Sequence, residues 1–153
     1  MTHPTTVNRA SDRDLVVTRM FDAPANAVFN AWTTPALMQQ WWAPQSFGMV
    51  LSACEMDVRV GGRYRFEFET AGPEPMVFFG RYLEVVPDSR LVWTNEESDA
   101  GAVTTITFDE RDGGTLLTMH ERHPSKQALD EAFDGTNACA PEQFTQLDAL
   151  LAG

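Results

Sequence analysis

The chain has 153 residues, of which 43% are hydrophobic and 22% are charged. This composition is typical of one globular domain, and no apolar run approaches the roughly 20 residues needed to cross a bilayer, so no membrane span is predicted. The formal net charge is −11, which would repel phosphate backbones, and nucleic acid is therefore not an expected partner.

The N-terminal residues are polar and lack a basic segment followed by an apolar one, so they do not resemble a secretory signal. We expect a flexible segment over residues 1–13, a single domain over residues 14–153, and a cytoplasmic location. The two cysteines, Cys54 and Cys139, would be reduced there, and we expect both to be buried as small hydrophobic residues.

A β-rich segment over residues 15–21 predicts the first strand, and Pro24 suits the first turn of a helix that follows it. Apolar residues then recur at helical spacing in two short stretches. Thr34-Pro35 separates these stretches, because the residue before a proline avoids the α region. The pattern predicts a strand followed by two short helices.

The middle of the chain predicts strands joined by turns. Residues 63–69 have the clearest period-two pattern, with Tyr64, Phe66 and Phe68 on one face and charged residues on the other. Gly61-Gly62 predicts a hairpin before this strand. The other strands are predicted over residues 50–58, 76–86, 91–96, 102–110 and 115–122.

Helical spacing returns after Pro124. It predicts a short segment that ends at Gly135 and then a long amphipathic helix, with Asn137 as a plausible cap and Pro141 in its first turn. Seven strands in hairpin connections, with helices near both ends, predict an α+β domain.

Four phrases carry a resemblance to a known family: FDAP at residues 21–24, WWAP at 41–44, GGRYRF at 61–66 and LEVVPDSRLVWT at 83–94. The chain resembles proteins similar to the C-terminal domain of the activator of the Hsp90 ATPase, in the START and Bet v 1-like (SRPBCC) superfamily. The resemblance implies a helix-grip fold, in which a curved seven-stranded antiparallel sheet surrounds a long C-terminal helix. The chain departs from the family pattern at Ala43, where glycine is usual, and at Ala140 or Pro141, where tryptophan is frequent.

This fold and the aromatic residues predict a cavity, between the sheet and the last helix, for a small hydrophobic or aromatic molecule. A completely filled core is the alternative. Trp41 and Trp42 point about 100° apart on a helix, so we expect one of them to line the cavity or its mouth. The candidate ligand-binding residues are Trp32, Trp41, Trp42, Phe47, Tyr64, Phe66, Phe68, Phe78, Trp93, His120 and Phe144.

An enzyme is one alternative function. His120, Glu121, Arg122 and His123 form the only dense titratable cluster in the sequence, and a cavity enzyme of cyclase or hydrolase type would use His120 or Glu121 as its base. Alternation along a strand would put His120 and Arg122 on one face and Glu121 on the other. The leading hypothesis therefore assigns no catalytic residue, and no cofactor or metal site is predicted, since the histidines lack ligand spacing.

Protein binding is the second alternative. Arg63, Arg65, Glu67 and Glu69 fall on the predicted outer face of the sheet and could dock a partner, as in an Hsp90-activator-like co-chaperone or stress-response module. A homodimer is also compatible with an exposed sheet and a terminal helix, although no residue pattern specifies an interface.

Overall fold

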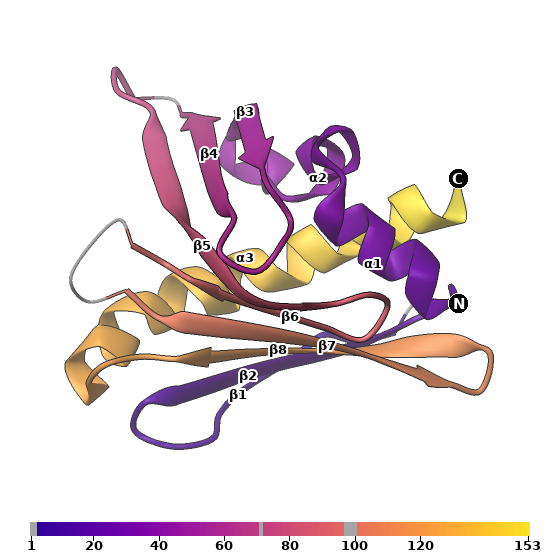
Figure 1. Ribbon diagram of the computed structural model, residues 1–153. Helices are drawn as coiled ribbons and strands as arrows, with labels where there is room; N and C mark the ends of the chain where they lie inside the picture. The colour runs from indigo at the N-terminus through magenta and orange to yellow at the C-terminus, as the bar shows by residue number, and fades with distance from the viewer. Residues whose placement is uncertain (1–2, 71, 97–100) are drawn as a thin grey trace.

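The computed structural model describes residues 3–70, 72–96 and 101–153. Within them, eight strands form an antiparallel sheet in the order β1-β2-β8-β7-β6-β5-β4-β3 (Figure 1). The strands are β1 (Thr6–Arg9), β2 (Asp14–Phe21), β3 (Val50–Met56), β4 (Arg63–Glu69), β5 (Met76–Val86), β6 (Arg90–Thr94), β7 (Val103–Arg111) and β8 (Gly114–Arg122). The helices are α1 (Ala25–Thr33), α2 (Pro35–Trp41) and α3 (Lys126–Ala152), with a short 3-10 turn, η1 (Gln45–Phe47).

The sheet curves along one side of α3, and α1 and α2 lie beside the C-terminal half of that helix (Figure 1). This is the predicted α+β helix-grip architecture, with the two short helices following β2. In the described residues, no helix is long and apolar enough to span a membrane.

The prediction of seven strands is wrong by one. The additional strand, β1, pairs with β2 at the edge of the sheet, from Thr6 opposite Thr18 to Arg9 opposite Leu15. It was missed because its four residues, TVNR, are mostly exposed and are too few to produce an alternating hydrophobic pattern. β1 lies within residues 1–13, whose flexibility remains a prediction.

The break between α1 and α2 is confirmed. Thr34 is extended, with φ −110° and ψ 116°, as expected for a residue before proline. Pro24 supplies no side-chain cap to α1, and the Glu110 carboxylate of β7 instead accepts a hydrogen bond from the Ala25 N–H at 2.9 Å. A strand distant in sequence therefore fixes the start of α1.

The prediction that a short helix ends at Gly135 is wrong, because α3 is continuous. Ser125 caps it by accepting a hydrogen bond from the Ala128 N–H at 3.1 Å. A glycine inside a helix costs only about 1 kcal/mol, which tertiary packing can outweigh. Pro141 lies within α3, and the helical hydrogen bond that it removes would involve the carbonyl of Asn137, an exposed residue that water can solvate.

Aromatic and aliphatic side chains fill the space between the sheet and the C-terminal half of α3. Trp32 is 1% exposed, and its ring centroid lies 4.7 Å from that of Trp41 and 6.3 Å from that of Phe144. The neighbouring β2 contributes Phe21, whose ring packs edge-on against Phe144 at 5.8 Å. These contacts form the solid part of the core.

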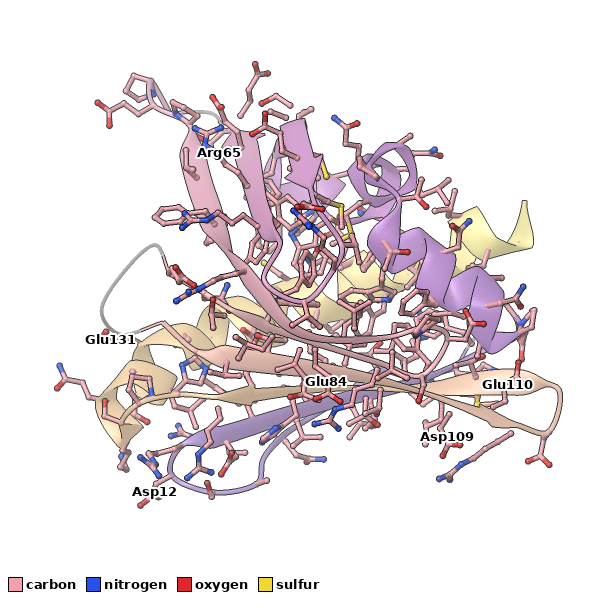
Figure 2. All side chains as sticks on the ribbon, in the orientation of Figure 1. Asp12, Arg65, Glu84, Asp109, Glu110 and Glu131 are labelled. Carbon is pink, nitrogen blue, oxygen red and sulfur yellow. The ribbon has the colours of Figure 1, made fainter. Side chains whose placement is uncertain are left out.

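A charged residue, Arg19, is buried beside this core. Arg19 on β2 is 3% exposed, its guanidinium is 5.1 Å from the Phe21 ring centroid, and its Nη2 is 3.4 Å from Oδ2 of Asp148 on α3. The acidic side chains labelled in Figure 2 lie instead around the outside of the molecule, at the turns, on β5 and β7 and on α3: Asp12, Glu84, Asp109, Glu110 and Glu131.

Candidate ligand-binding site

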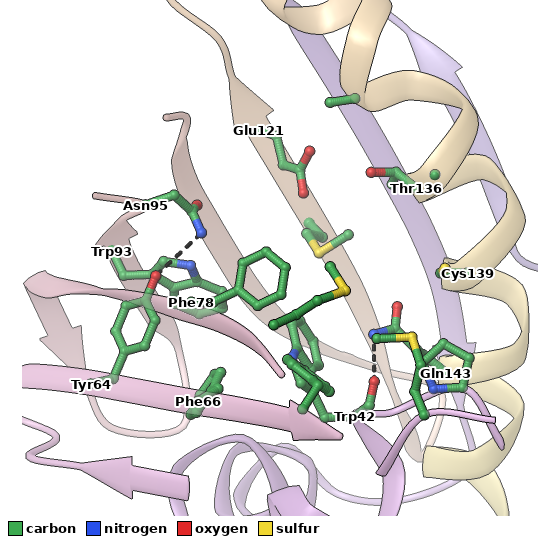
Figure 3. A pocket seen from close by; sticks show the side chains of 17 residues that line it. Trp42, Tyr64, Phe66, Phe78, Trp93, Asn95, Glu121, Thr136, Cys139 and Gln143 are labelled. Atoms are coloured by element: carbon green, nitrogen blue, oxygen red, sulfur yellow. Dashed lines mark hydrogen bonds between the residues drawn. The ribbon is translucent and has the colours of Figure 1, made fainter. Parts of the chain in front are cut away.

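A cavity of ≈ 390 Å³ lies between the sheet and the N-terminal half of α3. Its size falls within the roughly 300–1,000 Å³ typical of small-molecule sites. Met76 lines it and is 45% exposed, so the cavity reaches the surface at the start of β5. The lining residues are Trp42, Pro44, Met49, Tyr64, Phe66, Phe68, Met76, Phe78, Trp93, Asn95, Met119, Glu121, Ala132, Gly135, Thr136, Cys139 and Gln143 (Figure 3).

The sheet supplies an aromatic wall. Tyr64, Phe66 and Phe68 of β4 face the cavity because alternate residues of a strand share one side, as their pattern predicts. Phe78 of β5 packs edge-on against Phe68 at 5.5 Å. Trp93 of β6 continues the wall, with its ring 6.3 Å from that of Tyr64.

The helix supplies small side chains opposite this wall. Ala132, Gly135, Thr136 and Cys139 lie on successive turns of α3 and all line the cavity. A Cβ atom added to Gly135 would meet nothing within 4 Å. The space therefore exists because this stretch of α3 has no large side chain to fill it.

The two adjacent tryptophans divide between core and cavity, as expected from their angular separation. Trp41 is fully buried, and its Nε1–H donates to the Ala31 carbonyl at 3.0 Å. Trp42 is half-buried and lines the cavity, with its ring 6.3 Å from that of Phe66. Trp42 thus joins the solid core to the cavity wall.

Side chains of α3 hold the segment that follows α2. The Gln146 amide donates to the Trp41 and Ala43 carbonyls, both at 2.8 Å, and its oxygen accepts from the Gln45 N–H at 3.0 Å. Gln143 donates to the Trp42 carbonyl at 2.6 Å. These hydrogen bonds fix the position of the Trp42 ring at the cavity.

The same segment is also bound through Glu142 on α3. Its carboxylate accepts hydrogen bonds from the Ser46 hydroxyl and from the Ser46 backbone N–H, the latter at 2.7 Å. The hydroxyl and then the N–H hold the pKa of Glu142 below its usual range. Glu142 is therefore ionised at neutral pH and binds η1 to the helix.

Polar groups gather at one end of the cavity. The Tyr64 hydroxyl donates to the Thr94 carbonyl at 2.7 Å and accepts from Asn95 Nδ2 at 3.2 Å, and Asn95 Oδ1 accepts from the Thr104 hydroxyl at 3.2 Å. A side chain at Gly80 would prevent this arrangement, since its Cβ would lie 1.8 Å from the Thr94 oxygen. The phenol and the amide are thus engaged mainly with one another and with the backbone.

Glu121 of β8 lies at the same end and projects into the cavity (Figure 3). Its Oε1 is 3.3 Å from Nε2 of His123, whose side chain is 6% exposed against 19% for Glu121. A second cavity of ≈ 340 Å³ shares Phe78, Asn95, Glu121, Ala132 and Thr136 with the first. Glu121 therefore stands where the aromatic cavity meets a more polar one.

Six of the eleven candidate residues line the cavity: Trp42, Tyr64, Phe66, Phe68, Phe78 and Trp93. Trp32, Trp41 and Phe144 are instead buried in the core. Phe47 lies in η1, is 48% exposed and does not line the cavity.

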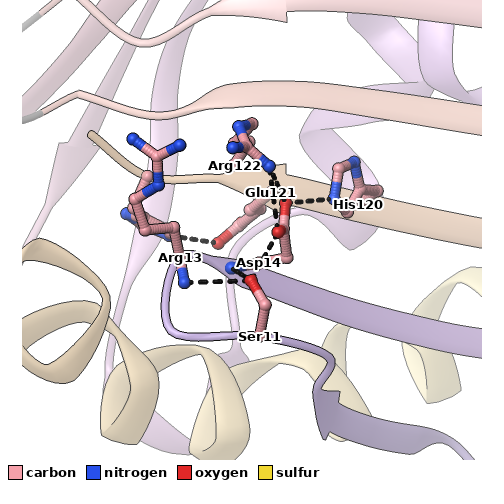
Figure 4. A network of polar contacts seen from close by, with 7 residues as sticks. Ser11, Arg13, Asp14, His120, Glu121 and Arg122 are labelled. Carbon is pink, nitrogen blue, oxygen red and sulfur yellow. Dashed lines mark hydrogen bonds and ion pairs between the residues drawn. The ribbon is translucent and has the colours of Figure 1, made fainter. Parts of the chain in front are cut away.

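His120 lies outside the cavity, contrary to its inclusion among the candidates. Alternation along β8 directs it to the opposite face from Glu121, where its Nε2 is 2.8 Å from Oδ1 of Asp14 (Figure 4). Arg122 binds the same carboxylate, with Nη1 3.0 Å from Oδ2. His120 and Glu121 therefore lie on opposite faces of the sheet, and of the two candidate bases only Glu121 lines the cavity.

Cys54 and Cys139 are free thiols. Both are half-buried, whereas the sequence predicted that they are buried. Burial raises the pKa of Cys54 to about 11. Burial, together with the nearby Glu142, also raises the pKa of Cys139. In the described residues, no group of three or more His, Cys, Asp or Glu side chains is arranged to hold a metal ion.

Several lining residues were not among the ligand-binding candidates predicted from the sequence: Met49, Met76, Asn95, Met119 and the small residues of α3. Glu121 was considered only as a possible catalytic base. The alternation that places His120 outside also directs Met119 and Glu121 inward, so the pattern of β8 contained that information. Met49 and Asn95 lie just outside regular elements, where no periodicity indicates a direction.

Comparisons with known proteins agree on the fold. The family model described as Activator of Hsp90 ATPase homolog 1-like protein matches residues 22–152. A solved structure from Rhodobacter sphaeroides is 23% identical with a TM-score of 0.89, and the match covers 97% of each chain. One from Chromobacterium violaceum is 29% identical with a TM-score of 0.77, covering 92% of this chain and 98% of that one. No curated protein matches the chain.

Proposed function

This chain belongs to the Activator of Hsp90 ATPase homolog 1-like family, and we propose that it is a cytoplasmic binding module for a small hydrophobic or aromatic molecule. The ligand occupies the cavity between the sheet and α3, and the module catalyses no reaction. The observation that carries this proposal is the pairing of an aromatic wall on β4, β5 and β6 with a run of small side chains on α3.

Physical chemistry supports this assignment. Aromatic faces at Trp42, Phe66 and Phe78 offer a large apolar contact area at low conformational cost. Each square ångström of apolar ligand surface removed from water contributes about 25 cal/mol. The lining is mainly apolar and aromatic, with a few polar side chains from Tyr64, Asn95, Glu121, Thr136 and Gln143, which is the composition typical of ligand sites.

Native mass spectrometry of the freshly purified protein, compared with its denatured mass, tests the proposal. We expect a reproducible small-molecule adduct that can be extracted into organic solvent and identified. A bare mass, unchanged after incubation with apolar extracts of the host cell, would contradict ligand binding and favour a protein-binding role.

A further inference from the structure

The charged groups that line the cavity are all of one type. Among the described residues, Glu121 is the only carboxylate in the wall of the larger cavity, and Glu131 joins it in the smaller one. Neither cavity has a lysine or arginine among its described lining residues, and the histidine of the smaller one, His123, is directed at Glu121, with Nε2 3.3 Å from Oε1. A ligand with a carboxylate or phosphate group would therefore meet repulsion from Glu121 at this end and find no lysine or arginine to bind it.

Glu121 has one oxygen available for a ligand. Oε1 contacts His123, whereas no hydrogen bond from any described residue engages Oε2. Of the neighbouring polar groups, Tyr64 and Asn95 already bind Thr94, Thr104 and each other, whereas the Thr136 hydroxyl also lines both cavities. Glu121 is thus the charged acceptor that a bound molecule would meet.

The rings beside Glu121 would strengthen the binding of a cation. Phe78 lines both cavities together with Glu121, and Trp93 and Trp42 extend the aromatic wall. An ammonium group is attracted to aromatic faces, and a charge-assisted hydrogen bond to a carboxylate is about twice as strong as a neutral one. Both terms favour a protonated amine over a neutral or anionic group at this position.

We propose that the ligand is an amine on a flat apolar body, with its ammonium group bound by Glu121 and its body against the aromatic wall. This inference rests on the proposed function, since it names the ligand class for the same cavity. It goes beyond that function because a purely apolar pocket would not discriminate between amines, alcohols and acids of the same shape.

Three probes with one ring system test the inference: naphthylmethylamine, naphthylmethanol and naphthylacetic acid. Isothermal titration calorimetry with the wild-type protein should give the tightest binding for the amine and the weakest for the acid. This ranking of affinities is measured on the wild-type protein, so it does not depend on whether a variant folds. Equal affinities, or tightest binding of the acid, would overturn the amine class while leaving the cavity as a binding site.

The Glu121→Gln variant tests the role of the carboxylate. It should weaken binding of the amine by roughly tenfold to a hundredfold, change binding of the alcohol far less, and improve binding of the acid. Glu55→Gln is the matched control, because Glu55 is exposed on β3 and lines neither cavity. Its amine affinity should equal that of the wild type.

The outcomes separate the two proposals. An unchanged amine affinity in a folded Glu121→Gln protein would overturn the assignment of the ammonium site alone. Failure of all three probes to bind the wild-type protein would overturn the cavity as a binding site, and the amine class with it.

Discussion

The two ends of α3 face the same sheet but pack against it differently. Near the C-terminus, Phe144 and Leu147 are at most 1% exposed and complete an aromatic core. Near the N-terminus, small residues from Ala132 to Cys139 leave a cavity of ≈ 390 Å³. The sheet is aromatic opposite both ends. Side-chain size on the helix, more than the composition of the sheet, therefore decides which end is filled.

The largest expected effect concerns the filled end. Phe144→Ala should lower the free energy of unfolding by about 3–5 kcal/mol, since it removes a ring packed on all sides. Phe78→Ala should cost less than about 2 kcal/mol, because Phe78 is half-buried and already borders empty space. Urea unfolding measures both. Equal losses would contradict the difference between the two ends.

A substitution at Gln146 tests whether its hydrogen bonds hold the segment after α2 against α3. Gln146→Ala should lower the free energy of unfolding by about 1–3 kcal/mol, because two carbonyls and one N–H lose a partner. Gln127→Ala, on an exposed face of the same helix, should change it by less than about 0.5 kcal/mol. Similar values for both variants in thermal or urea unfolding would mean that Gln146 does not anchor the segment after α2.

Filling the open end should affect binding more than stability. Cys139→Phe should abolish binding of naphthylmethanol yet change the free energy of unfolding by less than about 1 kcal/mol, since the ring enters space that is already empty. Cys139→Ala should retain binding. A folded Cys139→Phe protein that still binds the probe at wild-type affinity would show that the site lies elsewhere.

The smallest expected effect is the pH dependence of stability that arises from Asp14, on the outer face of the sheet. The Ser11 hydroxyl, with His120 and Arg122, lowers the pKa of Asp14 from 3.8 to about 2. A carboxylate with a depressed pKa stabilises the folded state above its unfolded pKa, and this contribution is lost as the pH falls from 3.8 towards about 2.

Asp14→Asn should therefore be less stable than the wild type at neutral pH, and the gap should close across that acidic range. Urea midpoints measured at a series of pH values would reveal this convergence. A gap that stays constant with pH would mean that the ionisation of Asp14 does not contribute to stability. Probe binding should be unaffected, since Asp14 lies on the face opposite the cavity.

Local patterns predicted much of this fold. The alternation over Tyr64, Phe66 and Phe68 and the break at Thr34-Pro35 each depend on a few neighbouring residues, and both are confirmed. The continuity of α3 through Gly135 and Pro141 was not predictable in this way, because packing against the sheet outweighs two unfavourable residues.

The cavity was harder to predict than the fold. Aromatic residues looked equivalent in the sequence, yet Trp32 and Phe144 fill the core whereas Phe78 and Trp93 line the cavity. The difference lies in α3: Phe144 is itself a large residue of that helix and packs against Trp32, whereas small residues of α3 line the cavity with Phe78 and Trp93. The sequence does not state which helix and sheet positions face each other. His120 was misplaced for a simpler reason, since alternation along β8 already directed it outward.

Methyl NMR of the methionines tests the central claim most directly, that the open end of the helix–sheet space binds a small apolar molecule. Met49, Met76 and Met119 line the cavity, whereas Met20 and Met56 do not. With naphthylmethanol, which tests the cavity independently of the ammonium site, we expect saturable shifts of the methyl signals of Met49, Met76 and Met119 and little change in those of Met20 and Met56. Shifts confined to Met20 or Met56, or no shift at saturating probe, would contradict it.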